Sequence, residues 1–364
     1  MKSDRAAEIF ITATPDQPQS ASEQAQALFT PIAGLLHKRK ARILHERIFA
    51  TQDAFEAVLP IRAAAYGDLD DGVPPLMLQV PQGLSGPVAG IQVHAVSSDE
   101  QPRVVRSGGV PCGRTLDADG LGYTSFSGLM APEAGPRTDQ AQAIFRKAES
   151  LLREAGGSMM SVARTWLWLS DILAWYNDFN KVRNDFFVEC GLLNPDRRER
   201  RLPASTGIGV GPTGRPLCAL DVVALLGPRA SVECFHAAGM QQSAYNYGSA
   251  FSRVARATTP AGKTVYVSGT AAIDETGKTC HVGDPKAQIA MTLANVRAAL
   301  SDMGCSDADV VASIAYSKTP EVEAVFLREF GDLGWPCVST LSDICRDELL
   351  FEVEATACLA AETI

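Results

Sequence analysis

The sequence predicts an α+β fold made of three tandem units with the element order β-β-α-β-α-β-β. The main observation is a repeat in which a glutamine precedes a leucine by twelve positions, with apolar residues at helical spacing between them. It occurs at residues 24–36, 140–152 and 288–300, and each copy is expected to form a helix. A second observation is that the same succession of segments follows every copy.

The segments after the first helix are expected in a fixed order. A strand comes next, at residues 41–51, 162–171 and 310–319. A second helix follows, at residues 52–66, 175–190 and 320–330. Then comes a proline-led extended segment, at residues 73–80, 202–208 and 335–341. A closing strand ends each unit, at residues 88–96, 217–226 and 349–358.

The segment before the first helix differs between the units. Units two and three have a hairpin pattern there, at residues 121–128 and 264–270, whereas unit one has only residues 8–13 and is therefore expected to be truncated. The expected boundaries of the units are residues 1–100, 101–230 and 231–364.

Composition and charge limit the function classes. The chain has 364 residues, is 46% hydrophobic and has a net charge of −9, which predicts a globular protein and argues against a nucleic-acid partner. No apolar stretch approaches the ~20 residues of a membrane span, and the polar start is no signal peptide, so we expect a cytoplasmic protein. The nine cysteines are scattered and the histidines follow no ligand spacing. We therefore expect neither a metal nor a cofactor.

The closing strand of unit three carries the candidate chemistry. In a strand over residues 349–357, Glu352 and Glu354 would share one face, while Phe351, Val353 and Ala355 would share the other. The alternative is a solvated face, because exposed carboxylates are common. A paired acid in an otherwise apolar strand is a candidate for general acid catalysis.

Unit three resembles a known family at three places. They are Ser268-Gly-Thr270 after a hydrophobic strand, Gly283-Asp284 before the third helix, and Phe351-Glu-Val-Glu-Ala355. These residues resemble the YjgF/RidA (Rid) family, also called endoribonuclease L-PSP. Rid proteins are homotrimers with pockets between subunits, so the resemblance implies that three fused units form a monomeric single-chain pseudo-trimer.

A narrower resemblance involves three separated segments. Residues 242–253, 202–209 and 343–352 are similar to chorismatases, Rid-like hydrolases that split chorismate into pyruvate and a cyclic carboxylic acid. Two departures exist. The segment between Tyr247 and Phe251 is shorter than expected, and Lys318 stands where an arginine would suit a carboxylate better.

Alignment of the three closing strands singles out one carboxylate. The position of Glu352 is held by Ala219 in unit two and Gly90 in unit one, and that of Glu354 by Asp221 and Gln92. Only unit three keeps an acid at the first position. The resemblance implies that Glu352 manages the proton, and the polar residue at the second position in every unit gives Glu354 a structural or supporting role.

The proposed chemistry needs further groups around Glu352. Burial would raise the pKa of this carboxyl group, so that it could protonate a C=C bond at neutral pH. Arg346 and Arg253 are candidate partners for a substrate carboxylate, although each could equally form a surface ion pair. Other candidate substrate-binding residues are Ser205, Thr206 and Gly207 in a turn of unit two, together with Tyr247, Ser268, Gly269, Lys318 and Cys345.

Several alternatives remain open for these residues. The turn at 205–207 could be a simple hairpin bend, with unit one closing the pocket instead of unit two. Cys345 has no paired histidine, so lining the pocket is favoured over a nucleophilic role. Three function classes follow: a chorismatase-like hydrolase of a small unsaturated carboxylate, a Rid-type enamine or imine deaminase, and a small-metabolite binding protein without catalysis.

Overall fold

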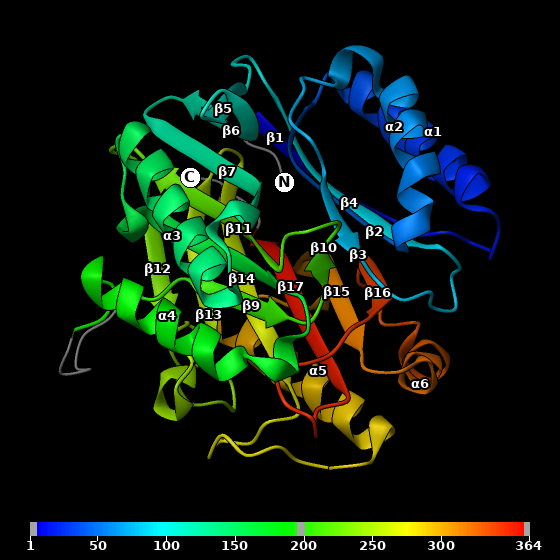
Figure 1. Cartoon of the computed structure of the whole chain (residues 1–364), viewed down its shortest axis with the longest axis vertical. Coiled ribbons are helices and arrows are strands. Elements are labelled where there is room, and N and C mark those ends of the chain that lie inside the picture. Colours follow the sequence, from blue (N-terminus) through cyan, green and yellow to red (C-terminus); the bar gives the residue numbers. More distant parts are fainter. Residues whose placement is uncertain (1–5, 195–200, 360–364) are drawn as a thin grey trace.

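The computed structural model describes residues 6–194 and 201–359, which form three mixed sheets with helices on their outer faces (Figure 1). Unit one contains β1 (Ala6–Ala13), α1 (Ala21–Arg39), β2 (Arg42–Ala50), α2 (Phe55–Tyr66), β3 (Leu76–Gln79) and β4 (Val88–Ser98). Unit two contains β5 (Arg103–Ser107), β6 (Val110–Ala118), β7 (Leu121–Leu129), α3 (Arg137–Glu154), β8 (Val162–Leu169), α4 (Tyr176–Glu189), β9 (Ala204–Ile208), β10 (Gly211–Pro212) and β11 (Cys218–Leu226). Unit three contains β12 (Val232–Phe235), β13 (Val254–Thr259), β14 (Gly262–Ala271), α5 (Pro285–Asp302), β15 (Val310–Ser317), α6 (Pro320–Phe330), β16 (Cys337–Leu341) and β17 (Phe351–Leu359).

The three sheets share one strand order. It runs β1-β4-β2-β3 in unit one, β7-β11-β8-β9 in unit two and β14-β17-β15-β16 in unit three. Units two and three extend this order with β5-β6 and β12-β13, whereas β1 lies at the edge of the sheet of unit one. The predicted α+β fold is therefore confirmed.

The glutamine of the repeat has the same task in all three units. It is the fourth residue of α1, α3 and α5, is buried, and accepts a hydrogen bond from the backbone N–H at the start of the closing strand. The bonds join Val88 to Gln24 at 3.0 Å, Leu217 to Gln140 at 3.0 Å and Leu350 to Gln288 at 2.8 Å. Each glutamine thus fixes the helix start against the closing strand, because a buried N–H needs a partner.

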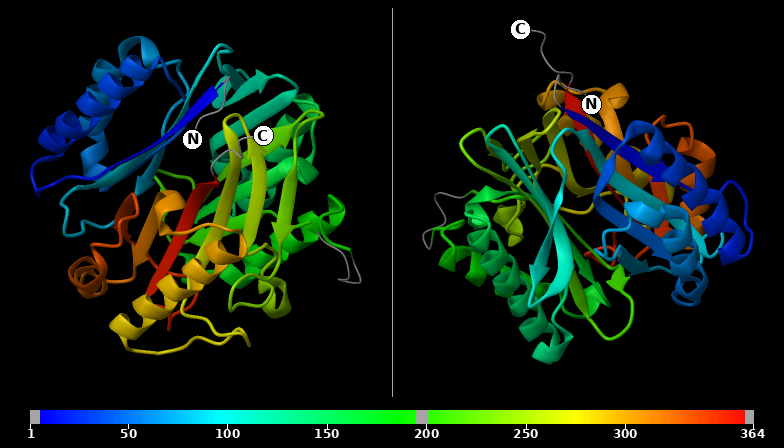
Figure 2. Two further views of the ribbon diagram at one scale, coloured as in Figure 1. Left: turned by 180° about the vertical axis from the view of Figure 1, so that it is seen from behind. Right: turned by 90° about the horizontal axis from the view of Figure 1, so that it is seen from above.

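The units pack cyclically around a shared interior (Figure 2). The strand that ends the shared strand order of each sheet lies against the next unit: β3 against β7, β9 against β14, and β16 against β4. One hydrophobic cluster takes residues from all three sheets, among them Phe49, Trp168 and Tyr316, which hold equivalent positions. This arrangement is a single-chain pseudo-trimer.

The segment after β9 links two units. Gly211 and Pro212 form β10, which pairs with β3 of unit one. A Cβ on Gly211 would lie 2.1 Å from Ser170 Oγ, so the close approach requires glycine. Within the described part of the chain, none of the helices combines the length and the hydropathy that crossing a membrane would require.

Candidate active site

Glu352 lies on the face of β17 that is turned toward unit two. Phe351, Val353 and Ala355 point the other way, into the core beneath α5 and α6. Glu352 itself is only 5% exposed. The predicted division of the strand into two faces is correct, and the alternative of a solvated acidic face is wrong.

The surroundings of Glu352 favour its protonated form. Burial, and after it the nearby charge of Glu354, raise the pKa of the Glu352 carboxyl group to about 8, against the opposing effect of Arg253 and Arg164. A carboxyl group with this pKa is largely protonated at neutral pH. It can therefore donate a proton, which an ordinary surface glutamate cannot do at that pH.

Glu352 opens into a cavity of about 140 Å³ between units two and three. Residues of α4 and β9 in unit two and residues of unit three line this cavity. They are Tyr176, Asn177, Asn180, Gly207, Tyr247, Ser249, Phe251, Arg253, Gly269, Ala271, Ile273, Cys345, Arg346 and Glu352. No residue of unit one is among them in the described part of the chain, so unit two forms the opposite wall.

Two arginines predicted to bind substrate line this cavity. Arg253 is buried and donates from Nε to the carbonyl oxygen of Gln242 at 3.0 Å and from Nη2 to the Tyr247 hydroxyl. Arg346 donates from Nη1 to the carbonyl oxygen of Gly277 at 2.9 Å. Its guanidinium lies 5.1 Å from the centre of the Tyr247 ring. Among residues 6–194 and 201–359, neither arginine has a carboxylate partner, so the surface ion pair considered for them is not formed.

A third arginine, Arg183 of α4, lies behind the wall formed by unit two. It is 1% exposed, and its Nη2 donates to Asn180 Oδ1 at 2.6 Å. Within the described residues its Nε and Nη1 have no hydrogen-bond partner. Burial lowers the pKa of Arg183, while Tyr176 and Cys345 oppose that effect. The cavity is therefore lined by two arginines, and Arg183 lies outside its lining.

Sequence reasoning missed the contribution of α4. Tyr176, Asn177, Asn180 and Arg183 occur in a helix that also contains phenylalanines, among them Phe179, which packs in the core. The available signal was the spacing of Asn177, Asn180 and Arg183 at every third residue, which places polar groups along one side of a helix otherwise rich in phenylalanine.

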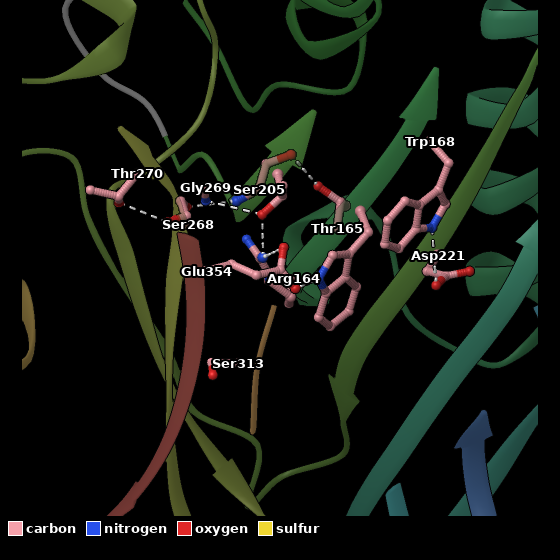
Figure 3. A network of polar contacts seen from close by, with 12 residues as sticks. Arg164, Thr165, Trp168, Ser205, Asp221, Ser268, Gly269, Thr270, Ser313 and Glu354 are labelled. Carbon is pink, nitrogen blue, oxygen red and sulfur yellow. Dashed lines mark hydrogen bonds and ion pairs between the residues drawn. The ribbon is translucent and has the colours of Figure 1, made fainter. Parts of the chain in front are cut away.

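The segment at 205–207 is a strand rather than a turn, since it lies within β9 and pairs in parallel with β8. Figure 3 shows Ser205, Ser268 and Gly269 at the contact between β9 and β14. Ser268 Oγ accepts from the Ser205 N–H at 2.8 Å and donates to the Ser252 carbonyl oxygen at 2.6 Å. Neither serine lines the cavity. Both hold the two units together.

Thr206 and Gly269 form the floor beneath Glu352. The Gly269 N–H donates to Thr206 Oγ1 at 3.0 Å, and Thr206 is not part of the lining. Gly269 was expected to let a ligand approach the backbone. A Cβ there would instead lie 2.1 Å from Glu352 Oε1, so the space left by the missing side chain holds the catalytic candidate itself.

Cys345 and Lys318 occupy different surroundings. Cys345 lines the cavity, and burial raises the pKa of its thiol to about 12, with Glu352 adding to the effect. The thiol is therefore protonated at neutral pH, which agrees with a lining role. Lys318 is not among the lining residues, and its Nζ donates to the carbonyl oxygen of Asp347 at 2.7 Å.

Glu354 belongs to a network between units (Figure 3). Its carboxylate accepts from Arg164 Nη2 at 3.0 Å and from Trp166 Nε1 at 2.6 Å, both on β8 of unit two. The equivalent Asp221 accepts from Arg47 Nε of unit one at 2.8 Å, and the equivalent Gln92 donates to the Ser313 carbonyl oxygen of unit three at 2.9 Å. This position therefore joins neighbouring units all around the molecule.

Comparisons with known proteins agree with the fold. Residues 244–358 match the model of the family described as Endoribonuclease L-PSP. A crystal structure of a chorismatase superposes with a TM-score of 0.65 and 19% sequence identity, covering 98% of this chain and all of that one. The whole chain thus has the fold of that chorismatase. The resemblance inferred from the sequence is confirmed.

Single-unit structures match about a third of the chain. A putative endoribonuclease from Thermotoga maritima has 24% identity and a TM-score of 0.28, and covers 35% of this chain with 99% of its own. A YjgF-family protein from Mycobacterium tuberculosis has 25% identity and a TM-score of 0.26, with coverages of 35% and 100%. Comparison with curated protein sequences gives no match.

Proposed function

We propose that the protein is a hydrolase of a small unsaturated carboxylate, in which protonated Glu352 acts as the general acid. The observation that carries this proposal is the buried Glu352 carboxyl group, with its pKa raised to about 8, in a cavity bordered by arginines that lack carboxylate partners. An acid that can donate a proton next to unpaired cations suits an anionic substrate that reacts by protonation.

The residues divide the reaction between binding and proton transfer. Arg253 and Arg346 bind carboxylate groups of the substrate, and the Tyr247 hydroxyl, bonded to Arg253, helps to orient them. Glu352 donates its proton to the terminal carbon of an enol ether C=C bond. Water then adds to the resulting oxocarbenium carbon, and the hemiketal collapses into pyruvate and an alcohol. Glu352 regains a proton from the added water.

The overall likeness to a chorismatase supports an enol ether substrate of the chorismate type. Cys345 and Tyr176 would then lie along the ring of the substrate, since both line the cavity. A Rid-type deaminase is the second candidate, supported by the match of residues 244–358 to the L-PSP family model. Protonation of an enamine carbon by the same Glu352 followed by hydrolysis of the imine would release ammonia.

Two coupled assays separate these candidates. Purified protein is incubated with chorismate and with enamines generated in place, and pyruvate is followed with lactate dehydrogenase and ammonia with glutamate dehydrogenase. Pyruvate release that disappears in Glu352→Gln supports the enol ether hydrolase. Ammonia release with the same dependence on Glu352 supports the deaminase. If neither product forms while ligands bind, the protein binds a small metabolite without catalysis.

A further inference from the structure

The three junctions between units are equivalent, and each contains a cavity. Pairing within each sheet places Gly207 of β9, Met77 of β3 and Ser339 of β16 at the same position. Gly207 lines the Glu352 cavity, Met77 lines a cavity of about 310 Å³ between units one and two, and Ser339 lines one of about 270 Å³ between units three and one. The junction between units one and two thus repeats the place, although not the chemistry, of the candidate active site.

The cavity between units one and two, here called the Met77 cavity, has mainly apolar walls. Its volume lies at the lower end of the roughly 300–1,000 Å³ typical of small-molecule sites. Apolar groups from both units form the walls, namely Pro74, Pro75, Met77, Pro111, Met130 and Pro212. The four prolines are rigid and help to keep the cavity open, whereas Met77 and Met130 are flexible and can adapt to the shape of a ligand.

Four polar side chains interrupt this apolar surface, Ser107, Ser127, Lys147 and Thr213, and two of them are important for binding. Lys147 of α3 is the one charged residue of the described lining, and its Nζ donates to the Met130 carbonyl oxygen at 2.7 Å, which leaves two further N–H donors. Ser127 is 7% exposed, and its hydroxyl has no partner among the described residues. The equivalent Ser268 is fully bonded at the other junction, so the fold does not require an unpaired hydroxyl here.

We propose that the Met77 cavity binds a small monoanion with an apolar body, such as an aromatic monocarboxylate. Lys147 supplies the single positive charge, and the Ser127 hydroxyl supplies a hydrogen bond. No acidic residue of the described lining competes for the cation. The Glu352 cavity, in contrast, is lined by two arginines.

Ligand in the Met77 cavity would be bound without being converted. The position equivalent to Glu352 in unit two holds Ala219, and Leu129 stands at the wall of the cavity. Asp221 is the nearest acid along β11, and it is already held by Arg47 and by the Gly128 N–H at 2.7 Å. The site therefore differs from the candidate active site in having no carboxyl group in its described lining, and the proposal stands whether or not the Glu352 cavity is catalytic.

The test uses sodium benzoate as the probe in isothermal titration calorimetry with the full chain. Binding at the Met77 cavity should weaken at least tenfold in Lys147→Gln, while Lys181→Gln, an exposed change on α4, should leave it unchanged. Val110→Asp provides a second variant, because Val110 lines the cavity and is 63% exposed, so the change places a repelling charge at the rim without disturbing the core. Thermal unfolding checks that both variants are folded.

The Glu352 cavity also contains cations, so the two sites must be told apart. Arg253→Ala should remove benzoate binding there and leave the binding that depends on Lys147. The proposal is overturned if Arg253→Ala abolishes all binding, if Lys147→Gln and Val110→Asp both bind benzoate like the unaltered protein, or if millimolar benzoate gives no heat of binding beyond dilution.

Discussion

The protonation of Glu352 depends on neighbours on both sides of the inter-unit contact. Burial is the larger cause of its raised pKa, and the charge of Glu354 is the next. Arg164 and Trp166 of unit two donate to the two oxygens of Glu354. Unit two therefore positions the side chain that, after burial, contributes most to the raised pKa of Glu352. The candidate acid and its supporting charge belong to one arrangement of side chains.

Replacement of the candidate acid tests the mechanism directly. Glu352→Gln should lower turnover at least ~10²-fold, because glutamine keeps the shape and hydrogen bonds but cannot deliver a proton. Steady-state kinetics with the substrate that the coupled assays identify measures the effect. Glu348→Gln, an exposed change four residues earlier, is the control and should leave turnover unchanged. Turnover of Glu352→Gln within about threefold of the unaltered protein would remove Glu352 from the mechanism.

The pH dependence of kcat/KM should follow Glu352 in the free protein. Below a pKa of about 8 the carboxyl group is mostly protonated and active, so kcat/KM should decline as the pH rises through that value. Glu354→Gln removes a charge that raises this pKa and should move the decline to lower pH. A pH profile of kcat/KM for both proteins measures the shift. An unchanged alkaline limb in Glu354→Gln would show that Glu354 does not tune the acid.

Sequence reasoning reached some residues of the candidate site and could not reach others. Alternation along β17 is a local signal, and it placed Glu352 on the correct face. Gly269 depends on a contact between strands 83 residues apart in the chain, so its role beneath Glu352 became visible only in the structure. The place of Arg183 also became visible only in the structure, because it is set by how α4 packs.

At the scale of elements, the glutamine at the start of the first helix of each unit makes the same hydrogen bond to the closing strand, which gives this residue of the repeat a structural role in all three units. Gln288 accepts from the N–H of Leu350, two residues before Glu352, and donates to the Glu348 carbonyl oxygen at 2.9 Å. The helix start thereby sets the position of the acid along its strand. Gln140 makes the same bond to Leu217 in unit two, where Ala219 stands at the position of Glu352.

This difference provides a matched pair of variants. Gln288→Ala and Gln140→Ala should each lower the free energy of unfolding by about 1–3 kcal/mol, because a buried N–H loses its partner. Only Gln288→Ala should also lower kcat, by about tenfold or more, since it displaces Glu352. Chemical denaturation and kinetics measure the two effects. Equal losses of kcat in both variants would contradict a specific link between α5 and the acid.

The longer elements could be predicted because helical periodicity and buried strands leave clear patterns. The short strands β5, β10 and β12 could not. β5 and β12 are partly exposed, so their sequences give little of the apolar signal that marks a buried strand. β10 pairs with a strand of another unit, and no local pattern indicates such a partner. Predictions from sequence therefore covered the repeated core and missed these short strands outside it.

At the scale of the whole molecule, three equivalent junctions have taken on different chemistry. The position of Glu354 is polar in every unit because it joins the units, whereas the position of Glu352 is acidic in one unit and holds small residues, Ala219 and Gly90, in the others. At Gly90 a Cβ would lie 2.8 Å from a methyl group of Val338, so even alanine is disfavoured at that junction. Fusion of the units allows each junction to change separately, which an assembly of identical subunits cannot do.

The same reasoning predicts that the protein is a compact monomer in solution. All three junctions form within one chain, and β1, the edge strand of unit one, lacks the hairpin partners that units two and three possess. A compact monomer of 364 residues should have a radius of gyration of about 21 Å, against about 31 Å for a compact homotrimer. Small-angle scattering over a dilution series distinguishes the two, and sedimentation should give a mass near 38.8 kDa. A homotrimer that persists on dilution would contradict the prediction, because pairing between separate chains would then supply contacts that the fused units already provide.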